Sequence, residues 1–157
     1  MDRVKDVLQG LLRPEFVFDL SPTLAKREAV MSLGKSASEA AGVKPEHLRA
    51  VLDALWDREQ ILSTGIGLGI AVPHVRHANV PNEVMRVGRS RQGLAFDAID
   101  GKPVHAVFTI LMPAGNHRRH VQVLGAIAAA VKDASRREGI FAAADSAAFV
   151  ERMIAST

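Results

Sequence analysis

Histidine is the residue type whose spacing in this chain first suggests chemistry. Four of the six histidines form two His-x-x-His pairs, His74 with His77 and His117 with His120. Zinc is the first hypothesis, because imidazole is a common zinc ligand. The spacing matches zinc sites poorly, since neither pair contains a carboxylate and the chain has no cysteine. We therefore expect no metal site and predict that His77 and His117 are solvated surface residues.

The segment that leads into His74 is rich in glycine. Its sequence is STGIGLGIAVPH, with Gly65, Gly67 and Gly69 at every second position. A dinucleotide-binding loop opens a helix and a Walker A loop needs Gly-Lys-Ser/Thr, whereas this segment runs into the strand-like IAVPH. Glycine permits positive φ and close approach of other groups, and proline stiffens the chain. Two interpretations stay open for His74: an ordinary histidine at a strand end, or an imidazole aimed at a ligand.

His120 has a different setting. It precedes Leu124 by four residues and Ile127 by seven, which predicts that it faces inward near the start of a helix. The free backbone N–H groups of a first helical turn favour a bound anion. The alternative is a core histidine hydrogen-bonded to a carbonyl. We expect His47 and His105 to be structural.

The elements that must position these residues are helices interleaved with strands. Apolar spacing predicts helices over residues 4–12, 23–41, 45–59, 117–131 and 145–154, and strands over 16–20, 84–90 and 105–113. We expect Gly34 to interrupt or kink the second helix, Gly42 to end it, and Asn116 to cap the fourth. Helices interleaved with strands predict an α/β fold, with one mixed sheet covered by helices on both faces.

Length and composition agree with one folded unit. The chain has 157 residues, of which 48% are hydrophobic, and this suits a single domain over residues 1–157 with a real core. No apolar run is long enough to span a bilayer. The amino-terminal MDRVKDVLQG breaks its hydrophobic residues with charge, so we expect no signal peptide and a cytoplasmic location.

The chain is basic, with a formal net charge of +3 and a pI near 9.7. We do not expect it to bind nucleic acid, because aromatic residues make up only 4% of the chain and tyrosine is absent. The basic residues are also scattered, apart from short groups such as Arg118 and Arg119. A surface that attracts an acidic or phosphorylated partner protein explains the charge equally well.

Four motifs in order carry a family resemblance. Arg58 and Glu59 end a predicted helix, the glycine segment leads to Pro-His, FDAIDGKPV (96–104) precedes an apolar strand, and HVQVLGAI (120–127) opens a helix. With these spacings the chain resembles the enzyme IIA (EIIA) domains of the bacterial phosphoenolpyruvate-dependent sugar phosphotransferase system (PTS), in the fructose, mannitol and nitrogen-regulatory branch. The resemblance covers nearly the whole chain. It implies a three-layer α/β/α sandwich with a mixed central sheet.

The resemblance also implies roles for individual residues. His74 is the histidine that becomes phosphorylated, His120 is the second active-site histidine, and Arg58 is the supporting arginine. Arginine offers a bidentate fork to phosphate, and a neutral imidazole offers one free nitrogen. Further support comes from hydroxyls and glycine backbone at Ser63, Thr64, Gly65, Gly67 and Gly69. No cofactor is implied, because the phosphoryl donor is a phosphohistidine and not a nucleotide.

The partners implied by the resemblance are proteins. The donor is the histidine-containing phosphocarrier protein (HPr), and the acceptor in sugar-transporting members is a cysteine of a IIB domain. Regulatory members instead bind target proteins according to their phosphorylation state. A stand-alone domain favours the nitrogen-regulatory type over the sugar-specific type. The alternative is a protein-binding regulatory module that has the IIA fold without phosphoryl transfer.

Overall fold

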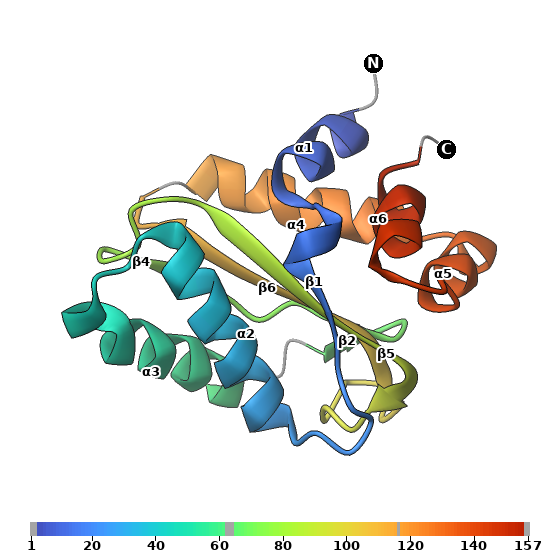
Figure 1. The fold of residues 1–157 in the computed structure, drawn as a ribbon, viewed down its shortest axis with the longest axis horizontal. Coiled ribbons are helices and arrows are strands. Elements are labelled where there is room, and N and C mark those ends of the chain that lie inside the picture. Colours follow the sequence, from blue (N-terminus) through green and yellow to red (C-terminus); the bar gives the residue numbers. More distant parts are fainter. Residues whose placement is uncertain (1–2, 62–64, 116, 156–157) are drawn as a thin grey trace.

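The computed structural model describes residues 3–61, 65–115 and 117–155 (Figure 1). The helices are α1 (Arg3–Leu11), the short 3-10 helix η1 (Pro14–Phe16), α2 (Lys26–Ala41), α3 (Pro45–Ile61), α4 (His117–Val131), α5 (Ala134–Phe141) and α6 (Ser146–Ile154). The strands are β1 (Val17–Asp19), β2 (Gly65–Gly67), β3 (Ile70–Ala71), β4 (His74–His77), β5 (Val84–Leu94) and β6 (Val104–Pro113). β1 lies between α1 and α2, and the other five strands follow one another between α3 and α4, so helices and strands are interleaved along the chain.

The strands form one mixed sheet with β6 near its centre. The order is β1-β5-β6-β3-β2, and β4 also pairs with β6. β5 and β6 are antiparallel, whereas β3 and β4 both run parallel to β6, one after the other along its length. Nearly every residue of β6 is buried, because helices cover both faces of the sheet.

Two hydrophobic cores lie on opposite faces of the sheet. On one face, α2 and α3 pack against residues such as Val107 and Leu111 of β6. On the other face, α1, α4 and α6 pack against Phe108 and Ile110 (Figure 1). The strand period of two residues sends neighbouring side chains of β6 to opposite faces. This arrangement confirms the predicted three-layer α/β/α sandwich.

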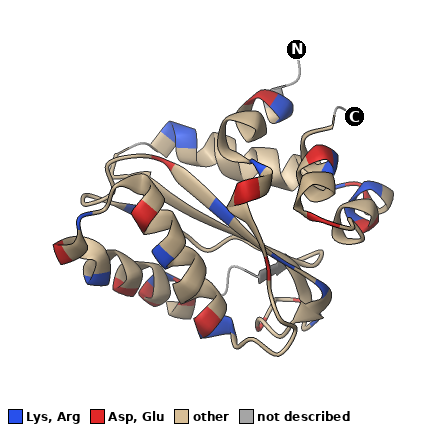
Figure 2. Ribbon diagram, viewed as in Figure 1, with Lys and Arg blue, Asp and Glu red and all other residues tan. Residues whose placement is uncertain are grey.

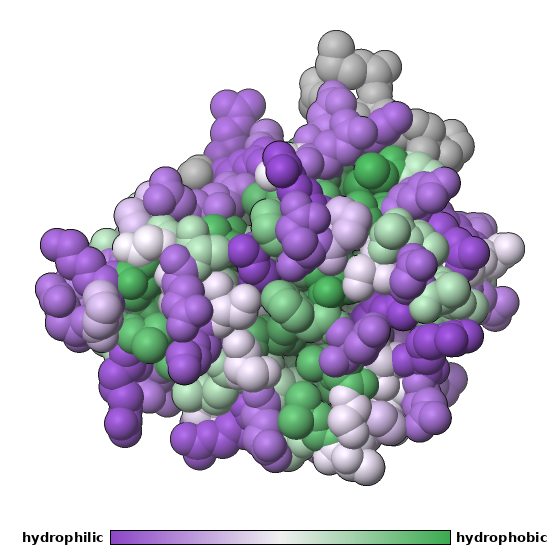
Figure 3. Space-filling model, viewed as in Figure 1, coloured by the Kyte–Doolittle hydropathy of each residue, from purple (hydrophilic) through white to green (hydrophobic). Residues whose placement is uncertain are grey.

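Hydrophilic residues cover most of the outer surface in the view of Figure 3, and hydrophobic residues show mainly in the recesses between them. Within the part of the chain that the structure describes, none of the helices combines the length and the apolar character that crossing a membrane requires.

The predicted break at Gly34 is wrong, because α2 runs through this residue without interruption. A Cβ added at Gly34 would lie 2.8 Å from Cδ2 of Leu55 and 3.0 Å from Cδ2 of Leu52. Glycine at this position therefore lets α2 and α3 pack closely. Gly42 ends α2 as predicted, with a left-handed φ of 84°.

Three further differences concern the ends and faces of elements. α5 is not among the predicted helices; its N-cap Asp133 accepts a hydrogen bond from the backbone N–H of Arg136 at 2.8 Å. β5 was predicted to end at residue 90, whereas the strand reaches Leu94 beyond an irregularity in its pairing with β6. Helical spacing also predicts that Val121 faces inward on α4, whereas Val121 is 56% exposed and Val123 is buried instead. The predicted cap Asn116 lies outside the described residues.

Candidate functional site

The glycine segment is a hairpin within the sheet. β2 and β3 are antiparallel, and the turn between them has positive φ at Gly67 (88°), Leu68 (61°) and Gly69 (77°). A Cβ at Gly69 would lie 2.7 Å from Cε2 of Phe141, so side-chain packing also requires glycine there. The hairpin turn and this packing account for Gly67 and Gly69. Direct support of a phosphate by Gly65, Gly67 or Gly69 stays a prediction.

β4 places His74 at the edge of the sheet. The strand pairs with β6 in parallel, with His74 opposite Ile110, and the carbonyl of Pro73 accepts a hydrogen bond from the Ile110 N–H at 2.9 Å. Val75 packs against the core formed with α2 and α3. Because side chains alternate along a strand, His74 and Arg76 share the opposite face, toward α4.

A backbone hydrogen bond fixes the imidazole of His74. Its Nδ1 lies 2.6 Å from the carbonyl oxygen of Val72. A carbonyl only accepts, so Nδ1 carries the proton and donates it to this bond. The lone pair is therefore on Nε2. The start of β4 thus presents a neutral imidazole with one nitrogen free to act as a nucleophile.

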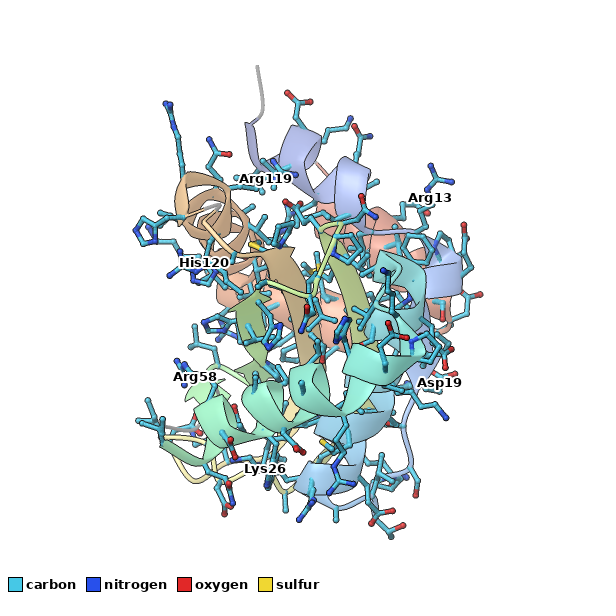
Figure 4. All side chains as sticks on the ribbon, turned by 90° about the vertical axis from the view of Figure 1, so that its left-hand side faces the viewer. Arg13, Asp19, Lys26, Arg58, Arg119 and His120 are labelled. Carbon is cyan, nitrogen blue, oxygen red and sulfur yellow. The ribbon has the colours of Figure 1, made fainter. Side chains whose placement is uncertain are left out.

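His74 lines a pocket of about 520 Å³ between the two helical layers. The lining residues are Arg58 from the last turn of α3, His74, Val75 and Arg76 from β4, Ala114 and Gly115 after β6, and His120 from the first turn of α4. Figure 4 shows Arg58 and His120 on the same flank of the molecule, on different helices. The structure thus brings together Arg58, His74 and His120, the three residues to which the sequence analysis assigns the central roles.

The histidines near the pocket form a row. The ring centroids of His74 and His120 are 4.9 Å apart and their planes are tilted by 49°. The ring of His117 stacks on that of His120 with centroids 6.3 Å apart. His77 is not in this row, and its Nδ1 accepts a hydrogen bond from the Asn79 N–H at 3.0 Å. The two members of each His-x-x-His pair therefore have different surroundings.

Burial and positive neighbours keep both pocket imidazoles neutral. The pKa of His74 lies below its ordinary value of 6.5 because burial penalises the charged ring, and the charges of Arg58 and Arg76 act in the same direction. The hydrogen bond to Val72 and the charge of Glu59 oppose this shift. The pKa of His120 is also lowered, first by burial and then by nearby His74 and Arg76. At neutral pH, Nε2 of His74 is unprotonated.

The pocket favours an anion. Arg58 and Arg76 both line it, and no carboxylate is among its described lining residues. The neighbouring Glu59 is 1% exposed and forms an ion pair with Lys26, whose Nζ lies 3.1 Å from Oε1. Arg76 is a charged lining residue that was not among the predicted site residues. The signal was its position two residues after His74 on a strand, which places both on one face.

Two predicted supporting residues, Ser63 and Thr64, lie outside the described residues. Across residues 3–61, 65–115 and 117–155, no group of three or more His, Cys, Asp and Glu side chains is arranged to hold a metal ion.

The comparisons with known proteins all point to one family. The model described as "Phosphoenolpyruvate-dependent sugar phosphotransferase system, EIIA 2" matches residues 11–156. The chain is 35% identical to the fructose-specific EIIA component of Haloferax volcanii over 122 residues, 78% of each chain. Among solved structures, nitrogen regulatory protein IIA-Ntr from Neisseria meningitidis superposes with a TM-score of 0.81 at 28% identity, over 94% of this chain and 99% of that one.

A solved complex also matches this fold. It is the complex of enzyme IIA mannitol with phosphorylated enzyme IIB mannitol from Escherichia coli. The superposition has a TM-score of 0.71 at 25% identity and covers 91% of this chain and 96% of that one.

Proposed function

Because this chain belongs to the EIIA 2 family of the phosphoenolpyruvate-dependent sugar phosphotransferase system, we propose that it is a phosphoryl carrier whose acceptor atom is Nε2 of His74. The observation that carries the proposal is the hydrogen bond from Nδ1 of His74 to the Val72 carbonyl. This bond leaves the lone pair on Nε2, in a pocket that holds two guanidinium groups. A single domain over residues 1–157 is part of the proposal.

The transfer step needs only a nucleophile and positive groups around phosphorus. The Nε2 lone pair forms a new N–P bond while the donor's bond to phosphorus breaks, and that electron pair returns to the donor nitrogen. The proton on Nδ1 stays in its bond to Val72, so the ring gains positive charge that the carbonyl stabilises. Arg58 and His120 hold the phosphoryl oxygens during transfer, and their charge and N–H groups match that role.

The proposed partners are proteins that carry phosphoryl groups. HPr, as a phosphohistidine donor, supplies the group, and a IIB domain or a regulatory target receives it or responds to it. The solved complex of a related IIA with a phosphorylated IIB supports the IIB alternative. The open pocket at a sheet edge suits transfer between proteins, because a partner's reactive residue can reach Nε2 without entering the core.

Within the family we propose the nitrogen-regulatory type, whose support is the 0.81 TM-score to the Neisseria meningitidis protein. The second candidate is a sugar-specific IIA component, which the 35% identity to the Haloferax volcanii protein favours. The two differ in the acceptor. Transfer of the phosphoryl group to the cysteine of a purified IIB domain would identify the sugar-specific type, whereas a target bound in only one phosphorylation state would identify the regulatory type.

The experiment that tests the carrier proposal is intact-protein mass spectrometry. Wild type, His74→Ala and His77→Ala are incubated with phosphoenolpyruvate, enzyme I and HPr. We expect one acid-labile phosphoryl group on wild type and His77→Ala and none on His74→Ala. Loss of phosphorylation from His77→Ala as well would refute the assignment to His74. No phosphorylation of the wild type by several phosphocarriers would favour a binding module with this fold.

A further inference from the structure

Arg76 contributes a second guanidinium to the pocket that the proposed function uses. It follows His74 by two residues on β4, so both side chains leave the same face of the strand. Both residues line the pocket, together with Arg58 from α3. The positive charge of Arg76 also acts on both imidazoles, since it is among the causes that lower the pKa of His74 and of His120.

The guanidinium of Arg76 is exposed and has no carboxylate partner among the residues that the structure describes. Two other arginines, one from the sheet and one from α4, differ in this respect. Arg89 is 5% exposed and forms an ion pair with Asp19, and the Nε of Arg119 lies 3.0 Å from both carboxylate oxygens of Glu83. Those two arginines connect parts of the fold, whereas Arg76 has no such structural role.

The chemistry of the carrier explains a second positive group. A phosphoryl group on Nε2 brings close to two negative charges into a pocket whose imidazoles are neutral. The fork of Arg58 can bind two oxygens and His120 can donate to the third, but the neutral imidazole brings no charge, so one guanidinium alone faces the dianion. Arg58 and Arg76 line the same pocket from different elements, α3 and β4, so a second guanidinium is available beside His74.

We propose that Arg76 is a further catalytic residue, which contacts the transferred phosphoryl group on His74 and stabilises its negative charge together with Arg58. This inference rests on the proposed phosphorylation of His74. Two other roles for Arg76 are the alternatives to this contact: stabilising the fold, and attracting a partner protein by long-range electrostatics.

Phosphoramidate separates contact with phosphate from attraction of a partner. This small donor transfers its phosphoryl group to imidazole as its P–N bond breaks and ammonia leaves. The reaction needs no partner protein. Wild type, Arg76→Gln, Arg76→Lys and Arg118→Gln are phosphorylated with it, and the rate is followed by intact mass. Arg118 is the matched control, because it is an exposed arginine in the first turn of α4 that does not line the His74 pocket. Figure 2 shows the basic residues at this end of α4.

We expect Arg76→Gln to be phosphorylated about tenfold more slowly than wild type, because one charge-assisted contact is lost at an exposed position. Arg76→Lys should recover part of the rate. In a ³¹P NMR titration of the phosphorylated proteins, the pKa of the phosphoryl group should be higher in Arg76→Gln than in wild type, since a nearby positive charge favours the dianion. Arg118→Gln should match wild type in both measurements.

Two results would overturn the role of Arg76. One is that Arg76→Gln is phosphorylated at a rate within about twofold of wild type and has an unchanged ³¹P titration. Loss of a charge-assisted contact of the usual strength would change the rate by more than this. The other is an equal effect of Arg118→Gln, which would show general attraction of anions. If the wild type accepts no phosphoryl group from either phosphoramidate or a phosphocarrier, the carrier proposal itself fails, and the role of Arg76 fails with it.

Discussion

His74 and His105 each have Nδ1 against a backbone carbonyl, but the two regions differ in the groups around the ring. Each lies at the start of a strand, β4 or β6. Nδ1 of His74 lies 2.6 Å from the Val72 carbonyl, and Nδ1 of His105 lies 3.0 Å from the Ser90 carbonyl. Each imidazole therefore has its proton on Nδ1. The strand register places the two regions roughly 17 Å apart along β6, at 3.3 Å per residue.

The surroundings of the two rings separate a candidate nucleophile from a structural histidine. His105 stacks on Phe141 with centroids 5.0 Å apart, and a Cβ at Gly93 would lie 3.4 Å from its Nε2. The nearby pocket contains both Arg91 and Glu138, so its charge is mixed. His74 instead faces a second imidazole and two arginines. Under the proposed function, a fixed tautomer and positive charge around a free Nε2 together qualify His74 as the phosphorylation site, and His105 has only the fixed tautomer.

The largest effect should come from filling the space beside His105. Gly93 has φ +91°, and an added Cβ would lie 2.5 Å from the Cβ of Pro103 and 3.1 Å from Cε1 of His105. We expect Gly93→Ala to lower the free energy of unfolding by about 3 kcal/mol, from the positive φ and the overlap together. Urea unfolding measures this change.

Gly101→Ala is the matched control for that substitution. Gly101 also has a positive φ, +68°, but an added Cβ would meet nothing within 4 Å. Its cost should be only about 1 kcal/mol. Equal losses in the two variants would show that close packing around His105 contributes nothing.

Removing the second imidazole of the pocket should slow phosphorylation. His120→Ala loses a hydrogen-bond donor to the phosphoryl oxygens, and we expect phosphoryl acceptance to be about 30-fold slower, near 2 kcal/mol. His105→Ala should accept the phosphoryl group at the wild-type rate. Single-turnover kinetics with a phosphorylated phosphocarrier compares them. A similar loss in both variants would contradict the distinction between the two regions.

The ion pair between Arg119 and Glu83 should have a smaller effect on the same step. It joins the first turn of α4 to the segment before β5, one residue from His120, and both side chains are partly buried. We expect Glu83→Gln to slow phosphoryl acceptance about fivefold. A partly buried ion pair stabilises the native position of the first turn of α4, and with it His120, by about 1 kcal/mol.

A double-mutant cycle tests whether this effect passes through His120. If the ion pair acts by positioning His120, Glu83→Gln should have no further effect in the His120→Ala background. The same fivefold slowing in that background would instead indicate a general change of the protein.

The smallest effect should be a dependence of stability on pH. The pKa values of His74 and His120 lie below 6.5 in the folded state, mainly because of burial, so the unfolded chain binds more protons below that pH. Stability should therefore fall as pH drops below 6.5, more in wild type than in a His74→Gln/His120→Gln variant. Urea unfolding at pH 7.5 and pH 5.5 measures the difference. A steeper loss in the variant would show that the sign of these shifts is wrong.

The sequence by itself determined most of the long elements and indicated the central residues of the candidate site. Apolar periodicity is local, so helices such as α3 and the strand β6 could be predicted within a few residues. The helix α5 was missed, because its eight residues carry only a weak apolar period. Arg58, His74 and His120 were selected through a family resemblance that the family match confirms, and their roles stay a prediction.

Only the tertiary structure decided how these residues meet. Register along β6 places His74 at the sheet edge between α3 and α4, and no spacing in the sequence encodes that register. The hydrogen bond to the Val72 carbonyl, which frees Nε2, depends on the backbone conformation around Pro73. Gly34 shows the same limit. Its sequence context predicts a break in the helix, whereas close packing against Leu55 explains why a glycine is needed at this position. Contacts between residues distant in sequence depend on three-dimensional packing, and local patterns do not record them.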